Sequence, residues 1–492
     1  MLSERRLVMF LFLVVIFTLA ARQVVDPDFW WHLKAGELVV TTRSIPHTDF
    51  FSATFSGRPW ITHEWLSESV IYLIYRGLGY PGLIAGFALL ITAGFGIALT
   101  RFAARVSHPF VAGGVLLLGG LAAAPTWNVR PQIFSFFFAS VWLALLDRHR
   151  KAPDSRTIWW LVPLMIIWAN AHAGFALGPV LTALTIVGVV LEGLISRGET
   201  LALVWPRVRI VCLVLVCCLG VIVINPNGVR LYSYPVETLT SHAMMKYIEE
   251  WWSPNFHELL FQPLAVFMLA TFAALSLSRK RIGLADLLLL MATAWAALRS
   301  GRNIPFFVLV ALPLLAEHAW DWLTAQSWGA WFERPEKVET GRAAMIKTSL
   351  NVVLLVVAPL LMAALRVGHS VAGQPATEAK WFPAAATEYL KTQQSPQPIF
   401  NEYGWGGYLI WKLYPQVHVF IDGRADVYGD AFFEEYMSVN SGEPGWREKL
   451  DQHDVRTVMV KPDAALASLL RQDSGWEKAF EDQSAVIFIR RH

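Results

Sequence analysis

The sequence predicts a polytopic α-helical membrane protein that ends in a small α/β domain. Hydrophobic residues make up 55% of the 492 residues and charged residues only 16%, well below the roughly 25% of a soluble domain. The apolar residues gather in blocks such as 7–21, 82–100 and 210–224. Blocks of this length can cross a hydrocarbon layer of about 30 Å as helices, which satisfy their own backbone hydrogen bonds. Trp159-Trp160 and Trp251-Trp252 stand at block ends, as interfacial anchors do.

These blocks predict about eleven transmembrane helices. Several of them are short for a bilayer, so they need flanking residues or a tilt. The first block also fits a cleaved signal peptide, because Arg5-Arg6 precede it and small residues follow it. The predicted spans are approximately 7–21, 81–100, 110–125, 133–146, 158–169, 176–195, 210–224, 259–277, 284–298, 304–317 and 349–365.

The distribution of basic residues predicts how the helices are oriented. Lys and Arg are denser in one alternating set of loops, for example at 148–151 and 279–281, and such loops are usually cytoplasmic. The amino terminus is then cytoplasmic, and the odd number of spans places the carboxyl end outside the inner (plasma) membrane. We therefore predict a transmembrane domain at 1–365, with a long first outer loop at 22–80, and an extracytoplasmic α/β domain at 366–492.

Charge and cysteine content exclude two classes of site. The net charge of +3 is too small to indicate a nucleic-acid partner, and no basic stripe with interleaved aromatics occurs. Cys212, Cys217 and Cys218 all fall within one apolar block. The sequence therefore has neither a disulfide framework in its exposed parts nor the cysteine spacing of a zinc site.

The first outer loop holds the candidate catalytic residues. Two carboxylates in Asp26-Pro-Asp28 follow the first helix, where they can act as a base or hold a divalent cation such as Mg²⁺ or Mn²⁺. An alternative is that Asp28 is only the N-cap of a following helix. His63-Glu64 offers a second candidate base, and His32 a substrate contact. Residues 65–75 are amphipathic and predict a helix lying on the membrane surface.

Polar residues recur where the other helices meet the outer interface. Arg130, Arg299 and Arg302 are candidate phosphate ligands, because a guanidinium fork matches phosphate oxygens. Asn170 and His172 are candidate substrate contacts. Any one of these side chains could be an ordinary headgroup anchor. Their concentration on one face indicates a site, because polar groups at membrane depth usually face a cavity or pathway.

Residues 366–492 change in character, since charge is spread throughout. Alternating strands and helices are expected there, which is typical of a small α/β layer domain. We predict strands at 397–401, 417–421, 455–460 and 485–490, and helices near 382–392, 406–413, 430–439, 444–451 and 463–472.

Two glycine-containing segments stand out in this domain. Residues 401–408 and 420–426 each follow a predicted strand, and ligands bind at the carboxyl ends of strands in open α/β sheets. Trp405 and Tyr408 could stack on sugar rings, and Asp422 and Arg424 could bind the substrate. The alternative is turn chemistry, with glycines in the turns and an Asp422–Arg424 pair that ties them down.

With these residues in view, the chain resembles the C-superfamily of membrane glycosyltransferases, the GT-C fold. This superfamily includes protein mannosyltransferases, oligosaccharyltransferases and aminoarabinose transferases. Asp26-Pro-Asp28 and the surface helix at 65–75 carry the resemblance. The chain is also similar to a group of bacterial membrane proteins with an Asp-x-Asp-x-Trp-Trp-His-Leu start and a Gly-Gly-Tyr-Leu-Ile-Trp segment near the end.

The resemblance implies transfer of a sugar from a polyprenyl-phosphate donor to an extracytoplasmic acceptor in the cell envelope. Asp28 would be the general base, Asp26 would orient the acceptor or help to bind a metal, and the arginines would hold the lipid phosphate. The sequence has neither a second acidic pair at 126–132 nor the Trp-Trp-Asp-Tyr-Gly motif of oligosaccharyltransferases, so the acceptor is left open as lipid, glycan or protein. A transporter or flippase, or a non-catalytic assembly protein, is the alternative function.

Overall fold

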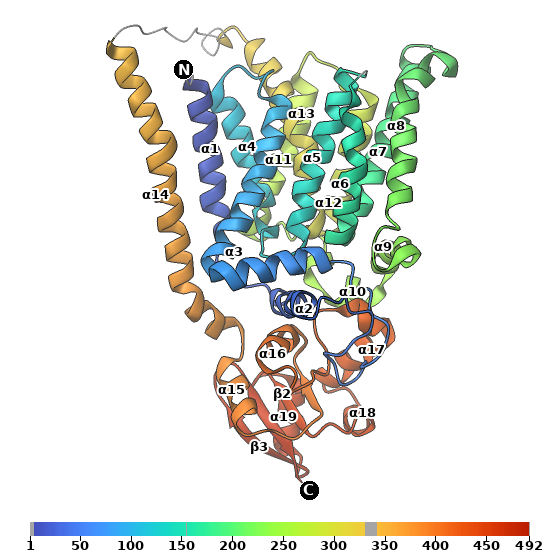
Figure 1. The fold of residues 1–492 in the computed structure, drawn as a ribbon, viewed down its shortest axis with the longest axis vertical. Helices are drawn as coiled ribbons and strands as arrows, with labels where there is room; N and C mark the ends of the chain where they lie inside the picture. Colours follow the sequence, from blue (N-terminus) through green and yellow to red (C-terminus); the bar gives the residue numbers. More distant parts are fainter. Residues whose placement is uncertain (1–3, 154, 330–341, 492) are drawn as a thin grey trace.

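The computed structural model describes residues 4–153, 155–329 and 342–491. Residues 1–3, 154 and 330–341 of the predicted domain 1–365 lie outside this description. So does residue 492 of the predicted domain 366–492. The described chain forms a bundle of roughly parallel helices, with helices lying crosswise beneath it. A carboxyl-terminal region (residues 384–491) lies below those (Figure 1). The prediction of a polytopic helical membrane protein with a small sheet is confirmed.

Each of the eleven predicted spans overlaps a helix of the bundle. Within the described residues, seven helices are long and apolar enough to cross a membrane, and they include α3, α4, α7, α8, α11, α13 and α14. The other four, α1, α5, α6 and α12, are shorter or end in charged residues but stand in the same bundle (Figure 1). The bundle helices are α1 (Glu4–Ala20), α3 (Trp65–Phe102), α4 (Pro109–Ala123), α5 (Gln132–Lys151), α6 (Leu161–Ala171), α7 (Leu177–Leu191), α8 (Leu201–Val221), α11 (Gln262–Leu277), α12 (Leu284–Arg299), α13 (Ile304–Thr324) and α14 (Arg342–Trp381).

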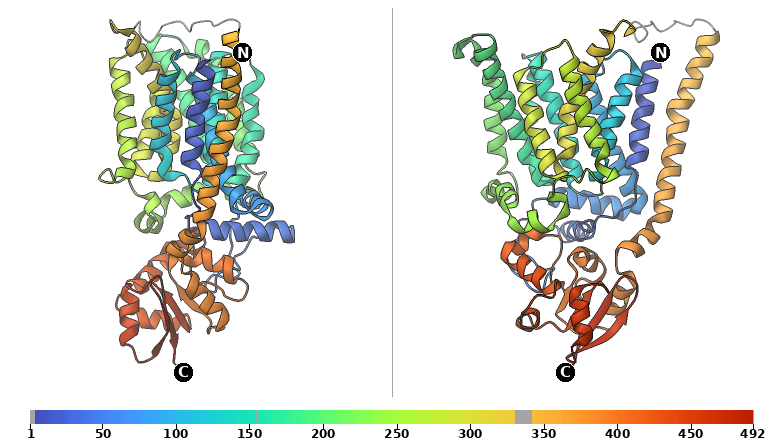
Figure 2. Two further views of the ribbon diagram at one scale, coloured as in Figure 1. Left: turned by 90° about the vertical axis from the view of Figure 1, so that its left-hand side faces the viewer. Right: turned by 180° about the vertical axis from the view of Figure 1, so that it is seen from behind.

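Helix α3 changes direction at Gly79 and so serves two layers. Its first part lies across the base of the bundle, as predicted for residues 65–75, and its second part rises into the bundle (Figure 1). Gly79 has a φ of 59°, a backbone conformation that glycine adopts without a steric penalty. Helix α2 (Phe29–Thr42) also lies crosswise beneath the bundle (Figure 2).

Short helices between α8 and α11 complete the base of the bundle. They are η5 (Gly228–Tyr232), α9 (Tyr234–Thr240), α10 (His242–Tyr247), η6 (Glu249–Trp251) and η7 (Leu259–Phe261). Helix α10 contacts α17 (Ala425–Asn440) of the carboxyl-terminal region. The hydroxyl of Ser241, the N-cap of α10, donates to Asp430 of α17 at 2.6 Å. The base is therefore built from parts of the chain that are distant in sequence.

The carboxyl-terminal region contains one four-stranded sheet, in the order β1-β2-β4-β3. Strands β1 and β2 are parallel, and the other two pairs are antiparallel. The strands are β1 (Ile399–Asn401), β2 (Thr457–Val460), β3 (Trp476–Glu481) and β4 (Val486–Arg490), and the helices are α15 (Ala384–Thr392), η10 (Tyr403–Trp405), α16 (Gly406–Leu413), α17 (Ala425–Asn440), α18 (Trp446–Gln452) and α19 (Ala465–Gln472).

Two strand predictions differ from this sheet. The predicted strand at 417–421 lies outside it, because Val419 instead forms a bridge with Ser52 of the first outer loop. Strand β3 was not predicted, because it is an edge strand in which half of the residues are exposed and charged, as in Glu477 and Lys478. An edge strand needs no apolar alternation on two faces.

The carboxyl-terminal region packs against α2 through α16. The Tyr408 ring lies 5.1 Å from both the Trp30 and the Phe382 ring, measured between centroids. Helix α14 continues past residue 365 into this region (Figure 1). The segment around Asp26 is thus held between the helix bundle and the carboxyl-terminal region.

Candidate functional site

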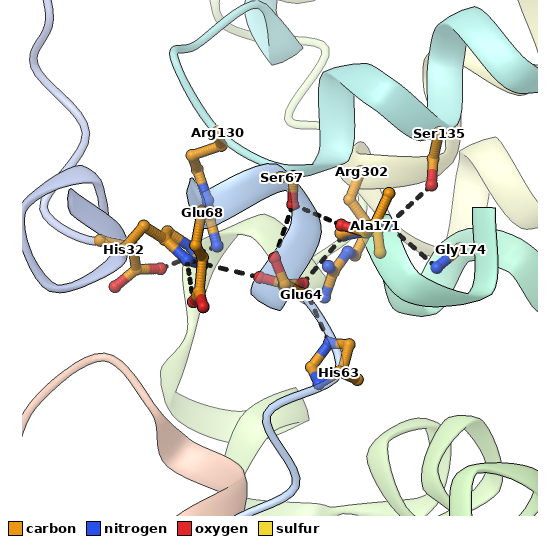
Figure 3. Close-up of polar contacts among 12 residues, drawn as sticks. His32, His63, Glu64, Ser67, Glu68, Arg130, Ser135, Ala171, Gly174 and Arg302 are labelled. Atoms are coloured by element: carbon orange, nitrogen blue, oxygen red, sulfur yellow. Dashed lines mark hydrogen bonds and ion pairs between the residues drawn. The ribbon is translucent and has the colours of Figure 1, made fainter. Parts of the chain in front are cut away.

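An inner cavity of about 110 Å³ lies between the base of the bundle and the carboxyl-terminal region. It gathers polar side chains from the first outer loop, from the loops that precede α5 and follow α6, and from the segments before α13 and α17. The acidic, basic and histidine residues that line it are Asp28, His32, His63, Glu64, Arg130, His172, Glu250, Arg302 and Asp426. Several residues that are far apart in the sequence therefore meet in one place, as the close-up in Figure 3 shows for part of the set.

Arg130 is the centre of an acidic group on one side of this cavity. Its guanidinium lies 2.7 Å from the Asp28 carboxylate and 3.4 Å from that of Asp26. It also lies 2.9 Å from the Glu250 carboxylate. Asn128 donates to Asp26 at 3.0 Å. Arg130 therefore balances three acids rather than standing free for a phosphate.

Asp28 occupies the N-cap position of α2, but its carboxylate caps none of the described backbone N–H groups. The carboxylate points instead to Arg130, and its side chain is 19% exposed. Burial raises the pKa of Asp28 to about 7, with Arg130 opposing the shift and Asp26 adding to it. Such a carboxyl group is partly ionised near neutral pH and so can accept a proton.

Asp26 is more deeply buried than Asp28. Its side chain is 4% exposed, and one oxygen accepts the backbone N–H of Asp28 at 2.9 Å. Burial raises the pKa of Asp26, and Arg130 opposes this shift. Asp26 therefore fixes the backbone that carries Asp28.

Glu64 lies at the centre of a second cluster, on the other side of the cavity. Its carboxylate is 3.0 Å from His63 Nε2 and 3.4 Å from His32 Nδ1 (Figure 3). It also lies 3.5 Å from His172 Nε2. Glu68, one turn along α3, lies 3.0 Å from His32 Nδ1. His32, His63, Glu64 and His172, which the sequence offered as separate candidates, therefore meet in one cavity.

The hydrogen bonds assign the protons in this cluster. His63 faces the Ile61 carbonyl with Nδ1, at 3.1 Å, and Glu64 with Nε2. Since both neighbours accept, His63 carries two protons. Burial lowers the pKa of His63, but the Glu64 carboxylate raises it above the ordinary value. Burial raises the pKa of Glu64, but the histidines, His63 foremost, bring it below its usual range. His63 and Glu64 thus form an ion pair.

His172 is neutral and held in one tautomer. Its Nδ1 accepts the backbone N–H of Gly174 at 2.9 Å, so the proton is on Nε2, which faces Glu64. The Ser135 hydroxyl lies 2.8 Å from the same Nδ1. Burial lowers the pKa of both His172 and His32 to about 3, so neither imidazole is charged at neutral pH.

A groove between the helices opens next to this cavity. One part, of about 270 Å³, shares Gln132, His172, Trp251 and Arg302 with the inner cavity. A second part, of about 900 Å³, continues between α7 and α12. The lining is mostly apolar, and among the described lining residues there is no carboxylate; the charged side chains are Arg302 and Arg299.

The three predicted phosphate ligands occupy different places. Arg302 lines both the groove and the inner cavity, stacks over the Trp251 ring at 4.4 Å and lies 3.8 Å from Glu250. Arg299 lies further along the groove, over Trp295 at 5.8 Å. Arg130 lies among the acids described above. Arg302 is thus the arginine at the junction of the groove and the cavity.

Five other predicted substrate residues lie away from the inner cavity. Asn170 accepts the Trp65 indole N–H at 2.8 Å and joins α6 to the start of α3. Trp405 and Tyr408 are buried, at 5% and 2% exposure, and the Tyr408 ring packs against Trp30 of α2. Asp422 and Arg424 pair with each other at 2.7 Å and are buried. The turn-chemistry alternative for Asp422 and Arg424 describes their contacts.

Four residues of the site were not among the predicted site residues. Glu250 pairs with Arg130 in the first cluster, and Glu68 pairs with His32 in the second. Tyr403 and Asp426 line the cavity from the carboxyl-terminal region. Tyr403 and Asp426 stand within the two glycine-containing segments, two residues away from Trp405 and Arg424. The motifs were thus informative, but the sequence did not show which of their side chains faces inward.

Comparisons with known proteins identify the fold. No family model matches the chain, and no curated protein matches it. The structure is similar to that of the archaeal oligosaccharyltransferase AglB from Archaeoglobus fulgidus in complex with an inhibitory peptide and a dolichol-phosphate, with a TM-score of 0.54, 11% identity, and coverage of 92% of this chain and 69% of that one. It is also similar to apo ArnT from Cupriavidus metallidurans, with a TM-score of 0.51, 17% identity, and coverage of 96% and 95%. Both are GT-C glycosyltransferases, and this chain has the GT-C fold.

Proposed function

We propose that this protein is a glycosyltransferase that moves a sugar from a polyprenyl-phosphate donor to an acceptor outside the cytoplasm. One observation carries the proposal. An apolar groove between membrane helices leads, through Arg302, directly into the cavity that contains Asp28. A lipid chain can therefore lie in the apolar groove while its phosphate lies at Arg302, next to the polar cavity that contains the base.

The groove suits the lipid part of such a donor. Its lining by Leu177, Val180, Leu239 and Phe306 is apolar, and it reaches Arg302 where the polar cavity begins. A guanidinium binds phosphate oxygens through paired N–H donors. Arg302 would hold the phosphate, and Arg299 would attract it along the groove.

Asp28 would act as the general base. It removes a proton from an acceptor hydroxyl, whose oxygen then forms a bond to the anomeric carbon of the donor sugar. The bond from that carbon to the phosphate oxygen breaks, and its electron pair leaves with the lipid phosphate. Arg302 stabilises the charge that develops on the leaving oxygen. Arg130 and Asp26 position Asp28, which revises the phosphate-binding role expected for Arg130.

The same layout supports an orientation in the membrane. The basic end of α5 (148–151) and the basic loop between α11 and α12 (279–281) lie at the end of the bundle opposite the carboxyl-terminal region (Figure 1). By the bias of Lys and Arg toward the cytoplasm, the amino terminus lies inside and the inner cavity outside an inner (plasma) membrane. Reporter fusions after residues 150 and 491 test this orientation.

The fold family implies a divalent cation, and the two candidate positions differ in fit. At Asp26 and Asp28 the Arg130 guanidinium already supplies the positive charge, so this pair does not fit a metal ion. His32, Glu64 and Glu68 each offer one ligand atom, and these atoms lie within 4.8 Å of one another. Among the described residues, Glu68 Oε2 is buried without a hydrogen-bond partner. Glu64 already pairs with His63, so a cation bound there would mainly neutralise Glu68, and it would join α2 to α3.

Metal content tests this second position. Protein purified in Mn²⁺ or Zn²⁺ and then desalted should retain about one ion per chain by mass spectrometry, and Glu68→Gln should lose it. Glu37→Gln is the matched control, because Glu37 is a carboxylate on α2 whose one ion pair among the described residues is with Lys34. Equal metal content in both variants would exclude this position.

Transfer from a labelled donor tests the proposed function itself. Purified protein is incubated with a radiolabelled polyprenyl-phosphate sugar and with envelope extract from cells that lack the protein. A new labelled product is expected, whereas a transporter would give none. Arg302→Ala should weaken binding of undecaprenyl phosphate by about tenfold to a hundredfold, as expected for the loss of a charged hydrogen bond. Arg281→Ala, at the opposite end of the bundle, should not.

A further inference from the structure

Glycines let the carboxyl-terminal region approach the acidic segment of the first outer loop closely. A Cβ atom on Gly423 would lie 1.7 Å from Asp28 Oδ1, and one on Gly407 would lie 2.7 Å from the Pro27 carbonyl oxygen. No side chain fits at either position without displacing its neighbour. The backbone at Gly423 therefore packs directly against the proposed base.

A buried ion network holds this approach in place. Arg424, which follows Gly423, pairs with Asp49 of the first outer loop at 2.7 Å as well as with Asp422. Its guanidinium also stacks over the Trp60 ring at 4.7 Å. The segment that follows thus has a fixed position, and Asp426 at the start of α17 faces the inner cavity.

A second, outer cleft opens next to the inner cavity at Asp426. It has a volume of about 440 Å³ and lies between the loop at Trp60, helices α9 and α10, and the start of α17. Trp60, Tyr234 and Asp426 line both this cleft and the inner cavity. A molecule in the cleft would therefore reach the inner cavity, which Asp28 lines.

The charge of the outer cleft is opposite to that of the groove. Glu237, Asp426 and Asp430 line the cleft, against one basic residue, Arg230. The described charged residues of the groove are arginines. A carboxylate accepts hydrogen bonds from hydroxyl and ammonium groups, whereas an anion would be repelled. The cleft is thus unsuited to the phosphate that the groove favours.

We infer that the outer cleft binds the acceptor, and that this acceptor is a hydroxyl-rich molecule, such as a glycan, without negative charge near the reacting hydroxyl. The inference rests on the proposed function and adds to it the acceptor class and the route of access. Asp426 would be the residue that selects against anionic acceptors. It would bind a hydroxyl or amino group of the acceptor next to Asp28.

Charged thiol reagents test the electrostatics of the cleft without any assay of transfer. In a variant with Cys212, Cys217 and Cys218 replaced by Ala, a single cysteine is placed at Thr240, which is exposed and lines the cleft. A cationic methanethiosulfonate should react there about tenfold faster than the anionic one at low salt. The matched control site is Thr392, which is exposed on α15 and outside the cleft.

Removing the carboxylate should remove the selectivity. Asp426→Asn in the Thr240→Cys background should lower the ratio of the two rates toward that of the Thr392→Cys control. Glu434→Gln, a change of an exposed carboxylate on the same helix, should leave it unchanged. Equal rates for both reagents at Thr240→Cys, or a faster reaction of the anionic one, would overturn the proposed acceptor class.

Blocking the cleft tests its role as the acceptor site. Thr240→Cys labelled with a bulky neutral maleimide should lose transfer of labelled sugar, yet bind undecaprenyl phosphate as before. Retained transfer would overturn the inference while leaving the proposed function intact. If the unlabelled protein neither binds undecaprenyl phosphate nor transfers sugar, the proposed function fails, and the cleft can then have no acceptor.

Discussion

Two arginines in this protein have similar acidic partners and different surroundings. Arg424 is 1% exposed and pairs with Asp422 and Asp49, and its guanidinium stacks on the ring of Trp60. Arg130 pairs with Asp26, Asp28 and Glu250, but its side chain is 15% exposed and lines the inner cavity. The first cluster is sealed by rings, whereas the second is open to a ligand.

The comparison shows that an arginine among carboxylates is not by itself a sign of function. In the sequence, Asp422-Gly423-Arg424 stands out as much as Asp26-Pro-Asp28. What separates the two clusters is whether the acids have room beside them for another molecule. We therefore expect the Arg424 cluster to determine stability and the Arg130 cluster to determine the rate of transfer.

Substitution of one aspartate in each cluster should separate these two roles most strongly. Asp28→Asn should reduce transfer by about 10²–10⁴-fold, the usual contribution of a general base, with little change in the melting temperature. Asp422→Asn should lower the free energy of unfolding by about 3–5 kcal/mol, because it leaves Arg424 with one buried partner fewer. Rates per folded molecule and thermal unfolding in detergent measure the two effects.

The comparison would fail if the two variants behaved alike. A fully active Asp28→Asn protein would remove the assigned base. An Asp422→Asn protein of normal stability, but without transfer, would move Asp422 from a structural to a functional role.

Gly423→Ala should have an intermediate effect, because Gly423 joins the two clusters. The added methyl group would displace the Asp28 carboxylate, and a displacement of about 1 Å can reduce a rate by about 10²-fold. Gly404→Ala is the matched control, since a Cβ there meets no described atom within 4 Å. Transfer rates of the two variants, compared at equal folded concentration, check this expectation.

The smallest expected effect is on the pH dependence of transfer, which should depend on the Arg130 cluster. Only ionised Asp28 can accept a proton, so kcat/KM should be half-maximal at a pH of about 7, the value to which burial raises the Asp28 pKa. At lower pH, kcat/KM should fall about tenfold for each pH unit. Asp26→Asn removes a negative charge that raises the pKa of Asp28, so the profile should move to lower pH. A profile unchanged by Asp26→Asn would contradict the coupling.

The raised pKa of Asp28 also has a consequence for stability. The folded state holds this proton more tightly than the unfolded state does. The contribution of Asp28 to stability is therefore lost as the pH rises from the ordinary range of a carboxyl group to about 7. Asp28→Asn should remove this part of the pH dependence of unfolding.

Several elements could be predicted because their signals are local. The predicted helix at 406–413 has the bounds of α16, and the predicted span at 259–277 covers η7 and α11. Both could be predicted because hydropathy and periodicity are properties of neighbouring residues. The strand predicted at 417–421 could not be judged locally, because its partner is Ser52 in the first outer loop. The count of spans and the domain boundary at residue 365 stay predictions.

The sequence by itself determined the membrane helices, the acidic pair Asp26-Pro-Asp28 and the concentration of polar residues on one face. Only the tertiary structure decided that Arg130 balances acids, that Arg302 stands where the groove meets the cavity, and that Gly423 touches Asp28. The physical reason is the range of the interactions. Hydropathy is a property of neighbouring residues, whereas charge pairing and close contact depend on which distant segments pack together.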